Sequence, residues 1–281
     1  MFSVVVPAHN EAASLSRLLR GLLGSAALDE LEIVVAANGC SDNTEAVASS
    51  FGPPVRVVAT SRASKTEALN LGDEAASCFP RFYVDADVEL DMTVLREVAA
   101  ALSVGPALIA SPAVAVRTKS SSWPVRAFYR VWSELPSVRG DVVGRGVYAV
   151  SRQGRRRFEE FPDLIADDHF VRTRFQPSER AVVSGSKSYV DAPRTFRALV
   201  RRQARVRAGN RYVDGLHGTH AEDRRGARGM WAVVSAEPAR ILDVPAYLAV
   251  AAASRFRSRR LHRGADPWGR DDSRAAPNGA E

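Results

Sequence analysis

The chain has 281 residues, of which 46% are apolar and 25% charged, a composition that excludes a globally disordered or collagen-like protein. Lysine and arginine number 39 against 32 aspartates and glutamates, so the formal net charge is +7, and nearly all of the positive charge is arginine. Guanidinium groups pair well with phosphate, which favours phosphate-bearing partners or an anionic membrane surface. Two cysteines cannot build a disulfide framework, and we expect reduced thiols.

The first hundred residues alternate short apolar runs with longer amphipathic segments. Runs rich in Val and Ile predict strands, and apolar residues spaced by three and four predict helices. The predicted strands are Phe2–Val6, Leu31–Ala36, Val55–Ala59 and Phe82–Val84, and the predicted helices are Glu11–Leu23, Thr44–Phe51 and Lys65–Ser77. Strands joined by crossover helices form a parallel sheet, and ligands bind beyond the carboxyl ends of its strands.

The alternation weakens after residue 108. The predicted elements there are a strand at Leu108–Val116, a helix at Val125–Leu135, a strand at Gly144–Val150, a helix at Asp167–Phe175, a hairpin at Ala181–Val190 around Gly185, and a helix at Arg194–Arg207. The polar, glycine-rich segment His217–Met230 predicts a mobile loop. Pro245–His262 predicts a helix with an apolar first half and an arginine-rich second half.

The start of the chain and its apolar stretches bear on membranes. The first residues lack the basic segment and apolar run of a signal peptide. The longest apolar stretch, Ile241–Ala253, is interrupted and shorter than the roughly 20 residues that a spanning helix needs. We therefore expect no spanning segment and a cytoplasmic location. The helix at Pro245–His262 fits either an interfacial helix on an anionic membrane or a helix packed against the rest of the fold.

Two aspartates, Asp85 and Asp87, follow the fourth predicted strand. If the strand continued, their carboxylates would lie on the same side, about 6 to 7 Å apart, and would repel each other. A divalent cation would relieve this repulsion, and Mg²⁺ or Mn²⁺ is usually held by one or two carboxylates together with substrate phosphates. In isolation, such a pair is more often a turn whose aspartates cap the next helix.

Six segments resemble, in the same order, the motifs of the family 2 glycosyltransferases, enzymes of the GT-A fold that use nucleotide-diphospho-sugars. The family patterns are P-x-Y-N-E, D-D-G-S-x-D-x-T, G-K-x-x-A-L-N, DxD, E-D-x-x-L and Q-x-x-R-W. The corresponding segments are Val4–Glu11, Ala37–Thr44, Ser64–Asn70, Asp85–Asp87, Ala166–Phe170 and Arg202–Val206. Each match is weak alone, and their shared order over about residues 2–210 makes the resemblance specific.

The resemblance implies an α/β fold of the GT-A type, a Rossmann-like and mostly parallel sheet flanked by helices in a single large domain. The expected catalytic domain covers residues 1–215, with a nucleotide-sugar half at about 1–110 and an acceptor half at about 111–215. A mobile loop and a C-terminal helix are expected at 216–264. The Asp-, Gly- and Pro-rich segment 265–281 predicts a disordered tail.

The resemblance also implies a reaction. The chain would be an inverting, metal-dependent, hexosyltransferase-like enzyme that moves a sugar from a nucleotide-diphospho-sugar to the hydroxyl of a small-molecule or lipid-linked acceptor in one displacement. Asp168 would be the general base, with support from Asp167. Asp85 and Asp87 would bind Mg²⁺ or Mn²⁺, which neutralises the leaving diphosphate. The implied substrate-binding residues are Pro7, His9 and Glu11 around the nucleoside, Asn38 at the base, Lys65 and Asp85 near the nucleotide, and Arg202 and Arg205 at the diphosphate.

Ordinary structural roles compete with several of these assignments. Asp167 and Asp168 suit any helix N-terminus, Lys65 suits a solvated helix start, and the cluster Arg201–Arg211 suits a solvated helix face. His217 and His220 have H-x-x-H spacing and would supply a third metal ligand or be ordinary loop histidines.

The chain departs from the family pattern at several positions. Ala37 and Asn38 stand where the family usually has two aspartates, so the carboxylate that typically reads the nucleobase is absent, although an amide still hydrogen-bonds a base edge. His9 replaces the usual Tyr, and Arg202 and Val206 replace the Gln and Trp of the last motif. The donor base is therefore left open, and processive polymerisation is not expected.

Two other functions each fit part of the sequence. A catalytically silent relative would bind a nucleotide or a partner without moving sugar, which fits Ala37 and the altered last motif, whereas Asp87 and Asp168 favour an enzyme. A nucleic-acid binder would explain the arginine excess, but Arg201–Arg211 contains no aromatic residue on which bases could stack, so no nucleic-acid partner is expected.

Overall fold

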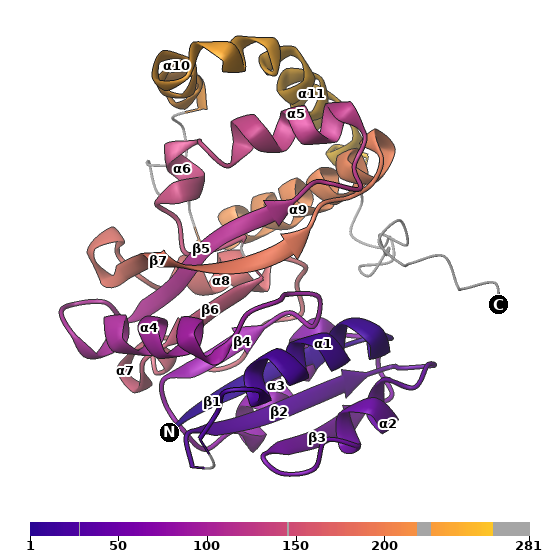
Figure 1. The fold of residues 1–281 in the computed structure, drawn as a ribbon, viewed down its shortest axis with the longest axis vertical. Helices are drawn as coiled ribbons and strands as arrows, with labels where there is room; N and C mark the ends of the chain where they lie inside the picture. Colours follow the sequence, from indigo (N-terminus) through magenta and orange to yellow (C-terminus); the bar gives the residue numbers. More distant parts are fainter. Residues whose placement is uncertain (28, 145, 218–225, 261–281) are drawn as a thin grey trace. The chain divides into compact units, whose positions relative to one another are not determined.

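The computed structural model of the chain describes residues 1–27, 29–144, 146–217 and 226–260 (Figure 1). They form two compact units. The first unit comprises Met1–Val114 and Asp141–Val190, and the second comprises Ala115–Gly140 and the chain from Asp191 onward. The expected catalytic domain at 1–215 stays a prediction.

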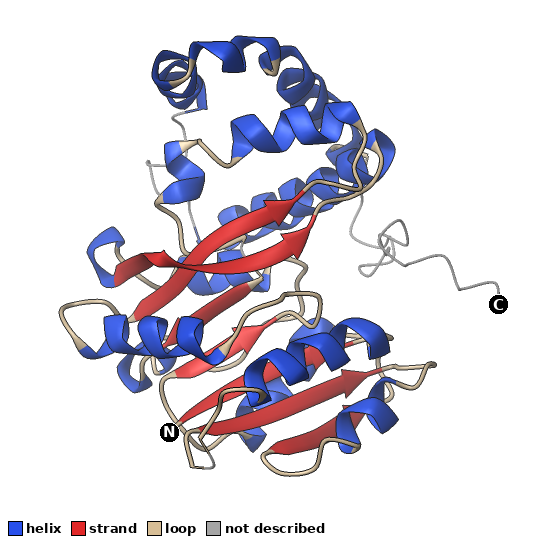
Figure 2. Cartoon of the chain, viewed as in Figure 1, coloured by secondary structure: helices blue, strands red, loops and turns tan. Residues whose placement is uncertain are grey.

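A seven-stranded sheet runs through the fold (Figure 2). Its strands are β1 (Phe2–Ala8), β2 (Leu31–Asn38), β3 (Val55–Thr60), β4 (Arg81–Val84), β5 (Ile109–Arg117), β6 (Val147–Val150) and β7 (Arg180–Asp191), in the order β3-β2-β1-β4-β6-β5-β7. β1 pairs in parallel with β2 and β4, and β2 with β3, as the sequence predicted. β6 runs antiparallel to both β4 and β5, so the sheet is mixed beyond β4.

Helices cover the parallel half of the sheet, and the apolar pattern explains why. β1 and β2 are buried along almost their whole length, as strands covered on both faces must be. The helices of this half are α1 (Ala12–Leu23), α2 (Thr44–Ser49), α3 (Lys65–Ala75) and α4 (Met92–Ser103). A Cβ added at Gly72 of α3 would meet the Val5 side chain at 2.4 Å, so glycine allows α3 to pack closely on β1.

The structure differs from the sequence predictions at β7 and α4 of the first unit. The hairpin at 181–190 is instead the single strand β7, because Gly185 keeps an extended backbone and the alternation of buried Ser186, Ser188 and Val190 with exposed neighbours continues to the end of the strand. In addition, α4 was not predicted, although Leu95 and Val98 are buried at helical spacing and Asp91 caps its start. The shorter elements of this unit are α7 (Arg152–Arg155), α8 (Asp167–Arg172) and the 3-10 turn Pro177–Glu179.

Helices dominate the second unit. They are α5 (Trp123–Trp132), α6 (Pro136–Arg139), α9 (Phe196–His217), α10 (Gly226–Ala236), the 3-10 helix η3 (Pro238–Leu242) and α11 (Val244–Ser258). α11 packs against α9 and α5, with Val250 in a buried cluster with Phe128 and Leu199. Within the described ranges, no helix is both long and apolar enough to cross a bilayer.

The predicted loop at 217–230 is partly wrong. α9 extends to His217, and α10 begins at Gly226, because Val233 supplies an apolar face that packs on Val131 and Leu135. The segment 218–225, which includes His220, and the predicted tail 265–281 lie outside the described residues.

Candidate active site

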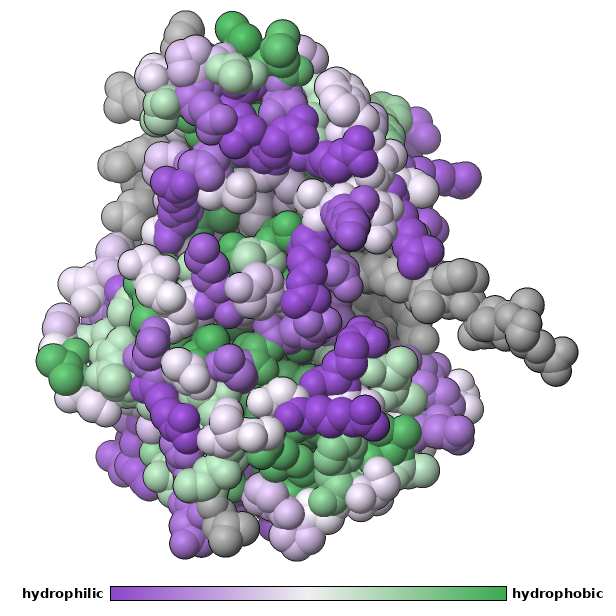
Figure 3. Space-filling model, in the orientation of Figure 1, coloured by the Kyte–Doolittle hydropathy of each residue, from purple (hydrophilic) through white to green (hydrophobic). Residues whose placement is uncertain are grey.

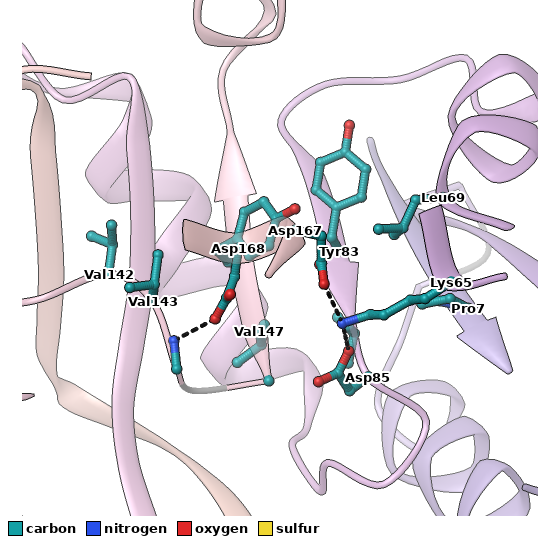
Figure 4. Close-up of a pocket in the computed structure, with 14 residues that line it drawn as sticks. Pro7, Lys65, Leu69, Tyr83, Asp85, Val142, Val143, Val147, Asp167 and Asp168 are labelled. Carbon is teal, nitrogen blue, oxygen red and sulfur yellow. Dashed lines mark hydrogen bonds and ion pairs between the residues drawn. The ribbon is translucent and has the colours of Figure 1, made fainter. Parts of the chain in front are cut away.

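An open pocket lies in the first unit, where β1 and β4 end and β6 begins (Figure 4). Pro7 of β1 and Asp85, directly after β4, line it from the parallel half of the sheet. The first residue of α3, Lys65, and the first two residues of α8, Asp167 and Asp168, complete its charged wall. The pocket therefore stands at the carboxyl ends of parallel strands, where α/β folds bind ligands.

Lys65 links two carboxylates from different elements. Its Nζ lies 2.8 Å from Oδ1 of Asp85 and 3.0 Å from Oδ1 of Asp167. The Asp167 side chain is only 6% exposed, whereas those of Lys65 and Asp85 are 26% and 38% exposed. Among the described residues that line the pocket, Lys65 is the one cationic side chain.

The charges of this cluster do not balance. Burial raises the pKa of Asp167 to about 6, because the attraction of Lys65 does not offset burial and the repulsion of Asp168 and Asp85. Burial and the nearby Asp87 likewise raise the pKa of Asp85 against the effect of Lys65. Burial alone would lower the pKa of Lys65, but the surrounding carboxylates raise it. The pocket therefore holds more negative charge than Lys65 can neutralise.

Backbone amides hold Asp168 in place. Its Oδ2 accepts a 2.7 Å hydrogen bond from the Gly144 amide, and its Oδ1 accepts one of 2.7 Å from the His169 amide. Gly144 and Gly146 both adopt positive φ, at 72° and 69°, and a Cβ on Gly146 would meet the Val88 side chain at 2.5 Å. Glycine is thus required in the loop that precedes β6.

Sequence reasoning missed this loop and two tyrosines. The Gly146 carbonyl accepts a 2.8 Å hydrogen bond from the Asp85 amide, which ties the loop to the end of β4. Tyr83 and Tyr148 line the pocket, with their rings stacked at 5.1 Å between centroids. The Tyr148 hydroxyl is buried and has no hydrogen-bond partner among the described residues. The predicted strand Gly144–Val150 includes both glycines, whereas β6 begins at Val147. The two glycines were the available signal for a loop there, and no sequence signal marked the tyrosines.

Three sequence-predicted residues belong to the first unit but do not line this pocket. The ring Nδ1 of His9 donates a 2.5 Å hydrogen bond to the carbonyl of Asn38, and the Glu11 amide donates one to the Thr44 hydroxyl. Asn38 is fully buried, and its Nδ2 donates a 2.9 Å hydrogen bond to the Ala8 carbonyl. These contacts join the ends of β1 and β2, and the proposed contacts of the three side chains with the donor stay predictions.

Asp87 does not lie on a continued strand. β4 ends at Val84 and the chain turns through Ala86 and Asp87, with the Val88 amide donating to the Asp85 carbonyl at 3.1 Å. The condition for the same-side strand geometry, a strand that continues to Asp87, is therefore not met, although Asp87 is near enough to act on the pKa of Asp85.

The two arginines of the last motif lie in the second unit. Arg202 and Arg205 are half-buried on α9, and their role at the diphosphate stays a prediction. Over the part of the chain that the structure describes, no group of three or more His, Cys, Asp or Glu could by itself hold a metal ion.

Comparison with solved structures gives the class of fold. A mannosyltransferase from Pyrobaculum calidifontis, solved with GDP-Man and Mn²⁺, aligns with a TM-score of 0.61 and 22% identity over 91% of this chain and 75% of that one. Glucosyl-3-phosphoglycerate synthase from Mycobacterium tuberculosis, solved with Mn²⁺, UDP and phosphoglyceric acid, aligns at 0.55 and 22% over 76% and 78%. These likenesses define the fold as GT-A and confirm the expected fold class.

The family follows from the sequence itself. Residues 3–161, more than half of the chain, match the model of glycosyl transferase family 2, and the chain belongs to that family. A search of curated protein sequences finds no match. The resemblance is thereby confirmed at the level of the family, and the matched residues include the first four motifs but not those at Ala166–Phe170 and Arg202–Val206.

Proposed function

We propose that the chain is an inverting, cation-dependent glycosyltransferase, hexosyl-transferring, that uses a nucleotide-diphospho-sugar donor. The main support for this proposal is that Asp85, Asp167 and Asp168 converge on one pocket around a single lysine (Figure 4). The GDP-Man complex of the Pyrobaculum mannosyltransferase and the UDP complex of the mycobacterial synthase support this class of donor.

The residues present fit a divalent cation. Asp85 and Asp87 offer the hard oxygen ligands that Mg²⁺ and Mn²⁺ prefer, and their mutual repulsion favours a bound cation. The lack of a third clustered ligand among the described residues suits an ion that takes its other ligands from the diphosphate and water. When bound, the cation would neutralise the charge that develops on the leaving diphosphate.

Asp168 is the proposed general base. The Gly144 and His169 amides orient its carboxylate, so little reorganisation is needed when it accepts a proton. As the acceptor oxygen bonds to the anomeric carbon, its proton passes to Asp168 and the bond from that carbon to the diphosphate oxygen breaks. Attack opposite the leaving group inverts the configuration. Asp167, held by Lys65, fixes the start of α8 beside the base.

The remaining donor contacts are proposed from the motifs and the pocket. Pro7, His9, Glu11 and Asn38 would frame the nucleoside, and Lys65, Arg202 and Arg205 would approach the phosphates. The unpartnered Tyr148 hydroxyl would find a hydrogen-bond partner in the bound donor, because a buried hydroxyl without a partner is costly. The acceptor would be a small molecule or a lipid-linked compound, and the enzyme would work in the cytoplasm with peripheral contact to the inner face of the membrane.

Donor turnover with defined stereochemistry tests the proposal. Purified chain is incubated with UDP-, GDP- and TDP-sugars and Mn²⁺, and release of the nucleoside diphosphate is measured with and without EDTA. We expect cation-dependent release from at least one donor, and NMR of the first-formed product should show the anomer opposite to that of the donor. Nucleotide binding without release from any donor would instead assign the chain as a catalytically silent relative.

A further inference from the structure

One face of α11 exposes large apolar side chains. Leu248 and Phe256 are 52% and 60% exposed, and Ile241 and Leu242 in the preceding η3 are 59% and 74% exposed. Ala252, between Leu248 and Phe256, is exposed as well. Spacings of four place Leu248, Ala252 and Phe256 on one side of the helix. In Figure 3, hydrophobic side chains gather at the top of the view, over the segment between α10 and α11.

The opposite face of α11 packs against the other helices of the second unit. Ala246, Val250, Ser254 and Ser258 are buried, and α11 packs there against α9 and α5. Folding alone favours small or polar residues outside and large apolar residues inside. α11 shows the reverse, so its outer apolar residues do not serve the core of the second unit, and exposed apolar strips of this kind mark interaction surfaces.

Arginines lie on both faces of α11. Nε of Arg207 donates a 3.1 Å hydrogen bond to the Ser254 hydroxyl, and one turn later Nη2 of Arg211 donates one of 2.7 Å to the Ser258 carbonyl. These bonds hold two guanidinium groups of α9 against the packed face of α11. Arg255 and Arg259 are exposed, and each lies three residues after a member of the strip, Ala252 and Phe256, on the same side of the helix. Burial lowers the pKa of Arg207, and the like charges of Arg255 and Arg211 add to this effect.

Arg255 and Arg259 have no carboxylate partner among the described residues, and α11 contains no acidic residue. Asp243, which precedes α11, is already bound by Arg130 at 2.5 and 2.8 Å. An anionic partner would therefore be attracted by both guanidinium groups without competition from a bound carboxylate.

We propose that this docking face, the apolar strip of η3 and α11 with Arg255 and Arg259, binds an anionic lipid bilayer. The apolar side chains would enter the boundary between headgroups and acyl chains, and the guanidinium groups would pair with headgroup phosphates. A nucleic acid would leave the leucines in water. The inference deepens the proposed function by bringing the enzyme to a lipid-linked acceptor, and it does not depend on transfer chemistry.

Vesicle sedimentation tests the docking face. Full-length chain is mixed with vesicles of phosphatidylcholine alone or with 30% phosphatidylglycerol, at low and at high salt. We expect binding to the anionic vesicles only, and weaker binding at high salt. Arg255→Gln with Arg259→Gln should lower the partition coefficient about 30-fold, since each basic residue at such a surface contributes roughly fivefold. Leu248→Gln with Phe256→Gln should lower it by at least tenfold.

Matched controls lie on the first unit. Val104→Gln removes an apolar residue that is 78% exposed, and Arg56→Gln with Arg62→Gln removes two exposed arginines. These variants should bind vesicles like the wild type, and all variants should keep its unfolding midpoint because every altered side chain is exposed. Equal loss in the controls would show that the effect is one of general charge and would overturn the proposal.

Other outcomes separate the partner classes. Equal recovery of the wild type in the soluble phase with and without anionic vesicles at low salt would overturn the proposal. Binding to polyglutamate or to single-stranded DNA in the absence of vesicle binding would also overturn it and would assign the face to a soluble polyanion. Release of nucleoside diphosphate from a donor sugar, measured in the same variants without vesicles, should be unchanged, so failure of docking remains distinguishable from failure of the proposed transfer.

Discussion

Two ionic clusters in the first unit use the same chemistry with opposite balances of charge. In one, the Asp73 carboxylate accepts hydrogen bonds from Arg81 at 2.6 Å, from Arg155 at 2.9 Å and from the Tyr83 hydroxyl. Burial would raise the pKa of Asp73, but the bonds from Arg155, Tyr83 and Arg81 outweigh it and the pKa is lowered. This carboxylate is held in its charged form and is fully partnered.

In the other cluster, one ammonium group serves several carboxylates. Lys65 bridges Asp85 and Asp167, with Asp87 and Asp168 nearby, and the pKa values of Asp85 and Asp167 are raised. The Asp73 cluster has more donors than its carboxylate needs, whereas the Lys65 cluster has too few. A surplus of donors is typical of a structural ion pair, and a surplus of carboxylates in a pocket is typical of a site that awaits a cation or a proton.

The largest expected effect is that of Asp168→Asn, beside the Lys65 cluster, on the rate of sugar transfer. Loss of the general base should lower the rate of sugar transfer by about 10² to 10⁴. The variant should unfold at the same urea concentration as the wild type or a higher one, because it removes a repelling charge. Asp87→Ala should instead weaken Mn²⁺-dependent nucleotide binding, measured by calorimetry. Wild-type turnover by Asp168→Asn would refute the assignment of the base.

The converse substitution is Asp73→Asn in the structural cluster. It leaves Arg81 and Arg155 without their buried counter-charge and should lower the free energy of unfolding by about 3 kcal/mol. The matched control is Asp163→Asn, at a side chain that is 73% exposed, where a change within about 0.5 kcal/mol is expected. Urea unfolding followed by circular dichroism measures both, and equal effects in the two variants would contradict the structural role.

Lys65→Met tests the shortage of positive charge in the second cluster. Without its ammonium group the site carries still more uncompensated negative charge, and Asp85 no longer shares an oxygen with Nζ. The affinity for Mn²⁺ without nucleotide should therefore rise about tenfold, a change of about 1.4 kcal/mol. Electron paramagnetic resonance of free Mn²⁺ gives the affinity. Lys65→Arg should stay near the wild type, as should Lys187→Met on the exposed side of β7. Unchanged or weaker Mn²⁺ binding by Lys65→Met would show that Lys65 does not compete with the cation.

The smallest expected effect concerns the pH dependence of stability, to which Asp73 and Asp167 should contribute with opposite signs. The lowered pKa of Asp73 stabilises the fold at pH values above its ordinary pKa near 4, and this stability is lost as pH falls through the lower folded pKa. The pKa of Asp167 is raised to about 6, so its ionisation costs stability as pH rises from about 4 to about 6.

Urea unfolding in EDTA between pH 3 and 7 tests this difference. Relative to the wild type, Asp167→Asn should gain stability across pH 4 to 6, by on the order of 1 kcal/mol. Asp73→Asn should be most destabilised above pH 4 and approach the wild type in more acid solution. Parallel pH profiles for the two variants would show that the clusters do not differ in their balance of charge.

Local patterns in the sequence determined the secondary structure of the parallel half of the sheet and the family of the protein. The alternation of apolar runs with amphipathic segments predicted the strands and helices of the parallel half, because burial on both faces or on one stripe leaves a readable periodicity. Motif order identified the family, and the motifs marked Lys65, Asp85 and Asp167 as site residues. β7 and α10 were misjudged because Gly185, Gly226 and Gly229 suggested turns, whereas packing of neighbouring residues decided their structure.

The partnerships inside the site were decided only by the tertiary structure. Lys65 meets Asp85 and Asp167, and Gly144 holds Asp168, because β6 runs antiparallel beside β4 and brings its preceding loop to the end of β4. No local periodicity encodes which strand lies beside β4. The surplus of negative charge depends on these distances and on burial, since the same aspartates in water would repel only weakly. Which charges share one low-dielectric pocket is therefore a property of the fold, although the residues that carry them were visible in the sequence.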